Sequence, residues 1–281
     1  MKIMMKSVWE YEQKKIAEQN RPEAALLKKC IDLCRSGDHA AWEVSLEALT
    51  INPDCALAWA IKAYFWEESE DFENALKAYN KATQLNPNDV DSWYSKGVIY
   101  QQQSKFQKAL EAHEKALLID PEFASCWLAK AASLIGLGNN LESLNACHKA
   151  IELKIQGLEA ASAWFLTGNA LTELRRHQEA TKAYNKAIKL RPNYSYAWCN
   201  KGLSLIEWGK YDEALRSIYE AINLRPKYTK FWVYNGNCLL KMERYEKALE
   251  AYERAIELDP KNTEAIKQKD CIVKQITHRN K

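Results

Sequence analysis

The chain has 281 residues, enough for one or two ordinary domains or for one elongated array. Its 40 Lys and Arg residues nearly balance its 37 Asp and Glu residues, which leaves a net charge of +3. This balance argues against a nucleic-acid-binding protein, because such proteins usually concentrate excess Lys and Arg on one face. No apolar run approaches the length of a membrane span.

Residues 1–21 form a charged N-terminal extension that lacks the apolar core of a signal peptide. We therefore expect a cytoplasmic protein, in which the eight cysteines are reduced and packed rather than paired in disulfides. Met4, Met5, Val8 and Trp9 form one apolar stripe if the extension is helical. A tail that does not pack on the rest of the chain fits the sequence equally well.

From residue 22 onward, one phrase recurs about every 34 residues. One column of this repeat holds prolines: Pro53, Pro87, Pro121, Pro192, Pro226 and Pro260. A second column holds tryptophans: Trp59, Trp93, Trp127, Trp164, Trp198 and Trp232. Each proline is expected to end a helix, and each Trp to be the large buried side chain of its unit.

Small residues occupy three further columns of the same repeat. Four residues after each Trp come Ala63, Gly97, Ala131, Gly168, Gly202 and Gly236. Sixteen residues after each Trp come Ala75, Ala109, Ser143, Ala180, Ala214 and Ala248, and seven residues further on the third column is Ala throughout. Small side chains allow two helices to approach closely, so each unit is predicted to be a pair of packed helices.

These columns and their period closely resemble the tetratricopeptide repeat (TPR). The resemblance implies an all-α fold, a right-handed superhelix of antiparallel helix pairs (an α-solenoid). We expect seven repeats, the first of them degenerate: residues 22–55, 56–89, 90–123, 124–160, 161–194, 195–228 and 229–262. Residues 263–281 are expected to form a capping helix and tail, with Ile266, Ile272 and Ile276 on its apolar side.

The segment KAIELKIQGLEAASAW, residues 149–164, breaks the repeat. Ile155 stands where proline is expected, and Trp164 comes three residues late. Without proline, we expect the preceding helix to run past Leu153 and to end at Gly157 in the left-handed conformation, with the next helix starting early. The prediction is a continuous stack with lengthened helices.

No catalytic constellation is recognisable in the sequence, so the chain is predicted not to be an enzyme and to need no cofactor. Cys30, Cys34 and His39 are the nearest candidates for a metal site, but a structural zinc site needs a fourth ligand, and packing is the favoured interpretation. Lysines three residues after Trp form a ladder that is interrupted at Thr167 and Asn235. Either these lysines attract an acidic ligand or, as we favour, their stems lie along neighbouring helices.

TPR proteins use the first helix of each repeat to line a concave groove, and the resemblance implies a peptide- or protein-binding scaffold. The candidate groove residues are Tyr64, Tyr94, Phe165, Asn169, Tyr196, Asn200, Lys230, Tyr234 and Asn237. Amides in such a groove bond a ligand's backbone, and an ammonium group receives a carboxylate.

Three alternatives stay open at this point. One TPR subfamily holds a partner's C-terminus in a carboxylate clamp. Asn169, Asn200 and Lys230 match that clamp, whereas Phe165 and Tyr234 depart from it. The second alternative is a helical-repeat nucleic-acid binder, which the charge balance disfavours, and the third is an enzyme with an unusual site. Self-association through the N-terminal region, which contains Trp9 and Trp42, is a further expectation about partners.

Overall fold

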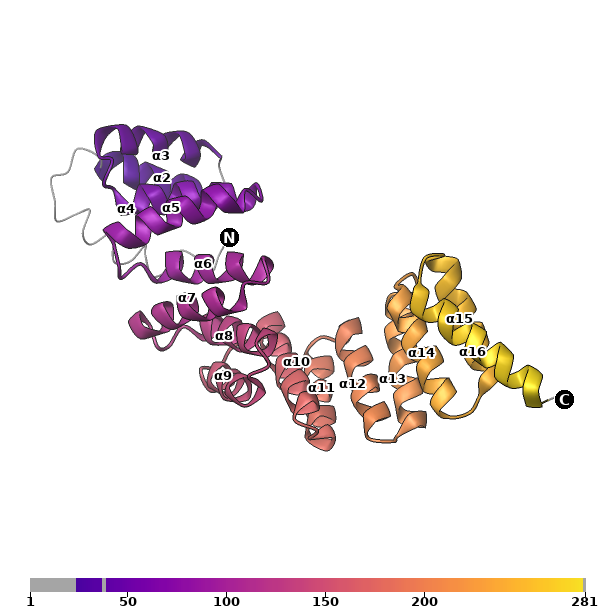
Figure 1. Cartoon of the computed structure of the whole chain (residues 1–281). Helices are drawn as coiled ribbons and strands as arrows, with labels where there is room; N and C mark the ends of the chain where they lie inside the picture. The colour runs from indigo at the N-terminus through magenta and orange to yellow at the C-terminus, as the bar shows by residue number, and fades with distance from the viewer. Residues whose placement is uncertain (1–23, 37–38, 280–281) are drawn as a thin grey trace. The chain divides into compact units, whose positions relative to one another are not determined.

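The computed structural model describes residues 24–36 and 39–279, and the chain is all-helical. The N-terminal extension at residues 1–21, including Trp9, lies outside the described residues. Within the described ranges there are fifteen helices in consecutive antiparallel pairs and no strand (Figure 1). The predicted all-α fold of antiparallel helix pairs is therefore confirmed, while the repeat count stays a prediction.

Contacts divide the chain into two units, Met1–Gly138 and Asn139–Lys281. The first unit contains α2 (Ala24–Ser36), α3 (Ala40–Ile51), α4 (Ala56–Glu68), α5 (Phe72–Leu85), α6 (Val90–Gln102), α7 (Phe106–Ile119) and α8 (Ala124–Gly136). The second contains α9 (Asn140–Glu152), α10 (Gly157–Glu173), α11 (His177–Leu190), α12 (Ser195–Glu207), α13 (Tyr211–Leu224), α14 (Thr229–Lys241), α15 (Tyr245–Leu258) and α16 (Thr263–Arg279).

Five helix pairs that lie within one unit are each joined by a short turn that contains a residue with a positive φ. This residue is Glu70, Ser104, Arg175, Gly209 or Glu243, with φ between 56° and 80°. In the α6–α7 turn, the Lys105 amide donates back to the Tyr100 carbonyl at 2.8 Å, which closes the end of α6. The left-handed residue therefore reverses the chain at the same point in each of these pairs.

The small-residue columns bring helices into close contact, as predicted. A Cβ added to Gly168 would lie 2.5 Å from the Tyr184 ring, and one added to Gly236 would lie 2.7 Å from the Tyr252 ring. These tyrosines are among the most buried large side chains of the described residues. A glycine on the first helix thus makes room for a ring on the second.

The repeated tryptophans are less buried than the sequence predicted. Trp59, Trp93 and Trp198 are only half-buried, and each indole N–H donates to the carbonyl oxygen of the proline six residues earlier. The corresponding distances are 2.8, 3.0 and 3.1 Å. An indole needs a partner for its N–H, and the proline turn supplies one at the surface. Where proline precedes the pair, the Trp therefore holds the preceding loop instead of filling the centre of the pair.

The three extra residues at the break are accommodated within α10. The prediction that the preceding helix runs past Leu153 is wrong, because α9 ends at Glu152 and Lys154 takes the left-handed conformation with φ 58°. Gly157 is left-handed as expected (φ 59°), but it begins α10 rather than ending α9. Helix α10 has 17 residues against 13 in α12, and it packs on α9, so the stack continues across the break within the second unit.

Helix α16 covers the last pair and has a different buried face from the predicted one. Ala265 and Ile272 are fully buried in the core of the second unit, with Tyr252 and Ala255. Ile266 is 37 % exposed, so its assignment to the apolar side of this helix was wrong. The Ile276 side chain lies outside the description.

Candidate functional site

The lysine ladder is engaged within the fold. The Lys96 ammonium lies 3.8 Å from the centre of the Trp93 ring and donates to Thr83 Oγ1 at 3.3 Å. Burial lowers the pKa of Lys96 to about 8. Where Thr167 interrupts the ladder, Lys186 from α11 lies 3.8 Å from the centre of the Trp164 ring instead. Cation–π contact with the repeated Trp therefore engages these lysines within the fold, whereas the favoured interpretation placed their ammonium groups in water.

In the first unit, the two candidate groove residues are held among other rings. Tyr64 is 9 % exposed and lies against Phe65, with ring centroids 5.6 Å apart. Tyr94 is half-buried and contacts Phe123 at 5.0 Å and His113 at 5.9 Å between ring centroids. Both side chains thus contribute to packing between neighbouring helices.

The second unit brings two of the candidate amides into direct contact. Asn169 on α10 accepts hydrogen bonds at the same Oδ1 from the Tyr184 hydroxyl and from Asn200 Nδ2, both at 2.9 Å. Burial raises the pKa of Tyr184, which keeps this hydroxyl a donor. Both amides are half-buried, so they are held in place while part of each faces solvent.

Asn237, at the same repeat position as Asn169, is bonded differently. Its Oδ1 accepts from the Tyr252 hydroxyl at 2.6 Å, and its Nδ2 donates to Glu264 of α16 at 3.2 Å. The capping helix therefore supplies a partner for this amide. A ligand that bonds Asn237 Nδ2 at this site competes with the Glu264 carboxylate.

Aromatic side chains surround the remaining candidates of the second unit. Phe165 contacts Tyr194 at 4.9 Å between ring centroids. Tyr196 makes edge contacts with Tyr228 and Phe231 at 5.8 and 6.0 Å, and it is 37 % exposed.

Two further candidates lie on α14. Lys230 is exposed on its first turn, and Tyr234 is half-buried, with its pKa raised by burial. The structure thus places Asn200 against Asn169 and Tyr196 within an aromatic cluster, whereas Asn237 is bonded to Glu264.

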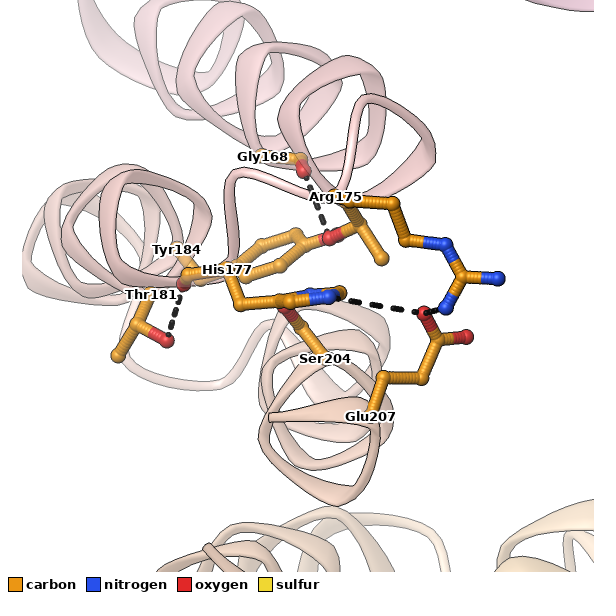
Figure 2. A network of polar contacts seen from close by, with 8 residues as sticks. Gly168, Arg175, His177, Thr181, Tyr184, Ser204 and Glu207 are labelled. Carbon is orange, nitrogen blue, oxygen red and sulfur yellow. Dashed lines mark hydrogen bonds and ion pairs between the residues drawn. The ribbon is translucent and has the colours of Figure 1, made fainter. Parts of the chain in front are cut away.

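A polar network beside the candidate amides joins α10, α11 and α12 (Figure 2). Arg175 donates to Glu207 at 3.0 Å, and His177 Nε2 lies 3.9 Å from the same carboxylate oxygen. His177 Nδ1 lies 3.3 Å from Ser204 Oγ, so its ring bridges the start of α11 and the middle of α12. These contacts fix the second helix of one pair against the first helix of the next.

A second group of contacts, centred on Tyr184, joins Thr172 to the amides. Thr172 Oγ1 donates to the Gly168 carbonyl at 3.0 Å and lies 3.3 Å from the Tyr184 hydroxyl. Tyr184 is the residue that also donates to Asn169. Sequence reasoning missed this link, although the pairing of Asn169 with Tyr184, and of Asn237 with Tyr252, at the same spacing is a signal that was available.

Six of the seven cysteines whose side chains are described are buried free thiols, and Cys271 is exposed. Cys30 is fully buried and donates to the Ala41 carbonyl at 3.1 Å, while the side chain of Cys34 lies outside the description. Burial raises the pKa of Cys147 to about 11 and of Cys199 to about 12, so these thiols are protonated at neutral pH. Within the described part of the chain, no three His, Cys, Asp or Glu side chains are placed to share a metal ion. No helix of that part has the length and apolar composition of a membrane span.

Comparison with known families identifies the repeat. A tetratricopeptide repeat model matches residues 90–123, 161–194 and 229–262. A second TPR model matches residues 68–104, and a third matches residues 183–216. No curated protein matches the chain in sequence.

Several solved structures share this fold at low sequence identity. PilW, described as a widely conserved type IV pilus biogenesis factor, aligns with a TM-score of 0.70 at 16 % identity, over 75 % of this chain and 97 % of its own. A TPR protein from Parabacteroides merdae ATCC 43184 aligns with a TM-score of 0.63 at 18 % identity, over 89 % of this chain and 98 % of its own. YrrB, described as a TPR protein with an unusual peptide-binding site, aligns with a TM-score of 0.54 at 22 % identity, over 69 % of this chain and 99 % of its own. With its repeated family matches and its paired helices, the chain belongs to the tetratricopeptide repeat proteins.

Proposed function

We propose that this chain is a non-catalytic scaffold that binds a peptide or protein segment through the first helices of its repeats, chiefly in the second unit. The observation that carries the proposal is the contact between Asn169 and Asn200, two half-buried amides held by Tyr184. Amides that are positioned by the fold and still reach solvent bond an extended backbone at little entropic cost.

The surrounding side chains supply two further kinds of contact. Tyr196 offers an exposed aromatic surface, and Phe165 and Tyr234 are half-buried on the same set of first helices. Lys230 is exposed and has no ion-pair partner among the described residues, so it is available to a carboxylate. Tyr64 and Tyr94 in the first unit are secondary members of the proposed surface, because packing occupies them.

A pull-down with the double variant Asn200→Ala, Lys230→Ala tests the site assignment. The matched control is Asn185→Ala, Lys189→Ala, which removes the same residue types from exposed positions on α11. We expect recovery of bound partners to fall about tenfold for the first variant, because it loses one neutral and one charge-assisted hydrogen bond, and to stay unchanged for the control. Equal recovery with wild type and both variants would remove these residues from the site.

A carboxylate-clamp-like co-chaperone is the second candidate, and the contact between Asn169 and Asn200 also favours it. In that case Lys230 would receive the terminal carboxylate of a partner. Peptides with a free C-terminus would then bind more tightly than the same peptides with an amidated C-terminus. Equal affinities for the two forms would leave the general scaffold and exclude the clamp.

A further inference from the structure

Two loops of the second unit depart from the loop chemistry of the other repeats. Four of the loops that follow a helix pair place Asn or Asp directly before proline. The Asn or Asp side chain accepts a hydrogen bond from the backbone amide two residues further on. These residues are Asn52, Asn86, Asp120 and Asp259, with distances of 3.0–3.2 Å. The α11–α12 and α13–α14 loops have Arg191 and Arg225 at this position. An arginine side chain has no acceptor and does not make that bond.

The backbone of the two arginine loops is nevertheless the same. The Tyr194 amide donates to the Arg191 carbonyl at 3.0 Å, and the Tyr228 amide donates to the Arg225 carbonyl at 3.1 Å. In an asparagine loop, the matching hydrogen bond from the Cys55 amide to the Asn52 carbonyl is 3.1 Å long. The turn therefore does not require arginine. Arginine in place of Asn or Asp loses a local hydrogen bond between the side chain and the backbone.

Both arginines lie on tyrosines instead of forming ion pairs. The Arg191 guanidinium lies 4.7 Å from the centre of the Tyr194 ring. The Arg225 guanidinium lies 5.0 Å from the centre of the Tyr196 ring, and it donates to the Tyr196 hydroxyl at 3.0 Å. Among the described residues, neither arginine has a carboxylate partner, whereas Arg175 and Arg244 are paired with Glu207 and Asp212.

These side chains form one continuous surface over two neighbouring loops. Burial raises the pKa of Tyr194, with a smaller contribution from the neighbouring Tyr196, and the Tyr194 ring contacts Phe165. Tyr196 contacts Tyr228, which in turn lies 4.6 Å from Phe231 between ring centroids. We define the arginine–tyrosine surface as Arg191, Tyr194, Tyr196, Arg225 and Tyr228.

We propose that the arginine–tyrosine surface binds an acidic peptide segment, whose carboxylates pair with Arg191 and Arg225. This inference rests on the proposed function and names the chemistry of its ligand. Stacking on a tyrosine holds each guanidinium in place, and its planar fork of N–H groups is paired with no carboxylate among the described residues. A planar fork held in this way suits bidentate carboxylate binding. The arginines also cover faces of Tyr194 and Tyr196, which disfavours base stacking by single-stranded nucleic acid.

Selection of a random peptide library on the immobilised full chain tests the proposal. We expect the selected peptides to be enriched in Asp and Glu over the input library. Their affinity for the double variant Arg191→Gln, Arg225→Gln should be at least about tenfold weaker than for wild type, because two charge-assisted contacts are lost. The control Arg216→Gln, Arg254→Gln removes the same charge from exposed positions on the second helices α13 and α15 and should bind as wild type does. Arg191→Lys, Arg225→Lys should restore binding only in part, because lysine lacks the planar fork.

Three results would overturn the inference. Selected peptides without an acidic excess, bound equally by R191Q/R225Q, would refute it and leave the scaffold function standing. Failure to select any peptide would count against both. Tighter binding of a single-stranded oligonucleotide than of the selected peptides, lost in R191Q/R225Q, would assign the surface to nucleic acid. Circular dichroism of each variant should match wild type, since Arg225 is exposed and Arg191 is a half-buried loop residue.

Discussion

One position on the first helices is buried in a repeat of the first unit and exposed in two repeats of the second unit. Two residues before the repeated Trp, the first unit has Leu57, which is 4 % exposed and packs in a cluster with α2 and α3. At this position the second unit has Tyr196, which is 37 % exposed, and Lys230, which is also exposed. The register of the helix is the same, so what differs is whether a neighbour covers this position. The same repeat position can thus pack against a neighbouring helix in one unit and expose its side chain to solvent in the other.

The largest expected effect separates these two uses directly. Leu57→Ala should lower the free energy of unfolding of the first unit by about 2–4 kcal/mol, because it leaves a cavity in a closed cluster. Tyr196→Ala should change the stability of the second unit by less than about 1 kcal/mol and should weaken peptide binding instead. Hydrogen exchange resolved by helix measures both units separately. A similar loss of stability for the two variants would show that Tyr196 is a core residue.

Acid should weaken the first unit through His113. Burial, with a smaller contribution from Lys130, lowers the pKa of His113 to about 4, whereas an unfolded chain binds this proton near pH 6.5. Between these values the unfolded state holds more protons, so stability falls as pH falls, by up to about 3 kcal/mol, and no further below pH 4. At the repeat position of His113, the second unit has Tyr184 and Tyr252.

His113→Tyr provides the matched variant for that pH dependence. It places in the first unit the residue that accompanies Gly168 and Gly236 in the second. We expect the difference in unfolding free energy between wild type and this variant to change between pH 6.5 and 4 and to be constant above pH 7. A difference that does not vary with pH would show that His113 binds its proton equally well in the folded and the unfolded chain.

A smaller effect is expected from the hydroxyl groups that hold the asparagines. Tyr252→Phe removes the donor to Asn237 and leaves a partly buried acceptor with one partner fewer, at a cost of about 1–2 kcal/mol. Tyr219→Phe, at a 43 % exposed site on α13, is the control and should have little effect. Thermal unfolding compares the two, and equal melting temperatures would mean that the bond to Asn237 contributes nothing.

The smallest expected effect is a gain in stability. Ser104 has φ 57° in the turn where Gly138 and Gly209 have φ 79° and 80°. Ser104→Gly should raise the free energy of unfolding by up to about 1 kcal/mol, because glycine adopts the left-handed conformation without the steric cost. A urea titration followed by hydrogen exchange measures this, and a loss of stability would show that the serine side chain has a role of its own.

The sequence predicted the features that repeat, since each has one physical cause. Gly168 and Gly236 are small because a tyrosine ring lies opposite, and the late Trp164 correctly indicated an early start for α10. The exposure of individual residues was harder to predict, because it depends on which neighbour covers them. Trp59 was expected to be fully buried in the core and is half-buried over its proline turn.

The aromatic and arginine contacts of the second unit were not predicted at all. Arg191 and Arg225 lie in loops, outside the repeated columns of the helices. The asparagine loops have a hydrogen bond from a backbone amide to the Asn side chain, and only the structure shows that contacts with tyrosine replace it at the two arginines. A residue that differs from the type shared by most repeats at the same position is thus a usable signal of a different contact. It is found by comparing the repeats with one another.

Photo-crosslinking most directly tests the claim that the second unit displays a peptide-binding surface. A benzophenone amino acid replaces Tyr196 in one variant and Tyr219 in another, two exposed tyrosines on the first and the second helix of the same pair. The account predicts that peptides selected on the full chain crosslink to position 196 and not to position 219. Crosslinking at position 219 alone, or at both positions equally, would contradict it.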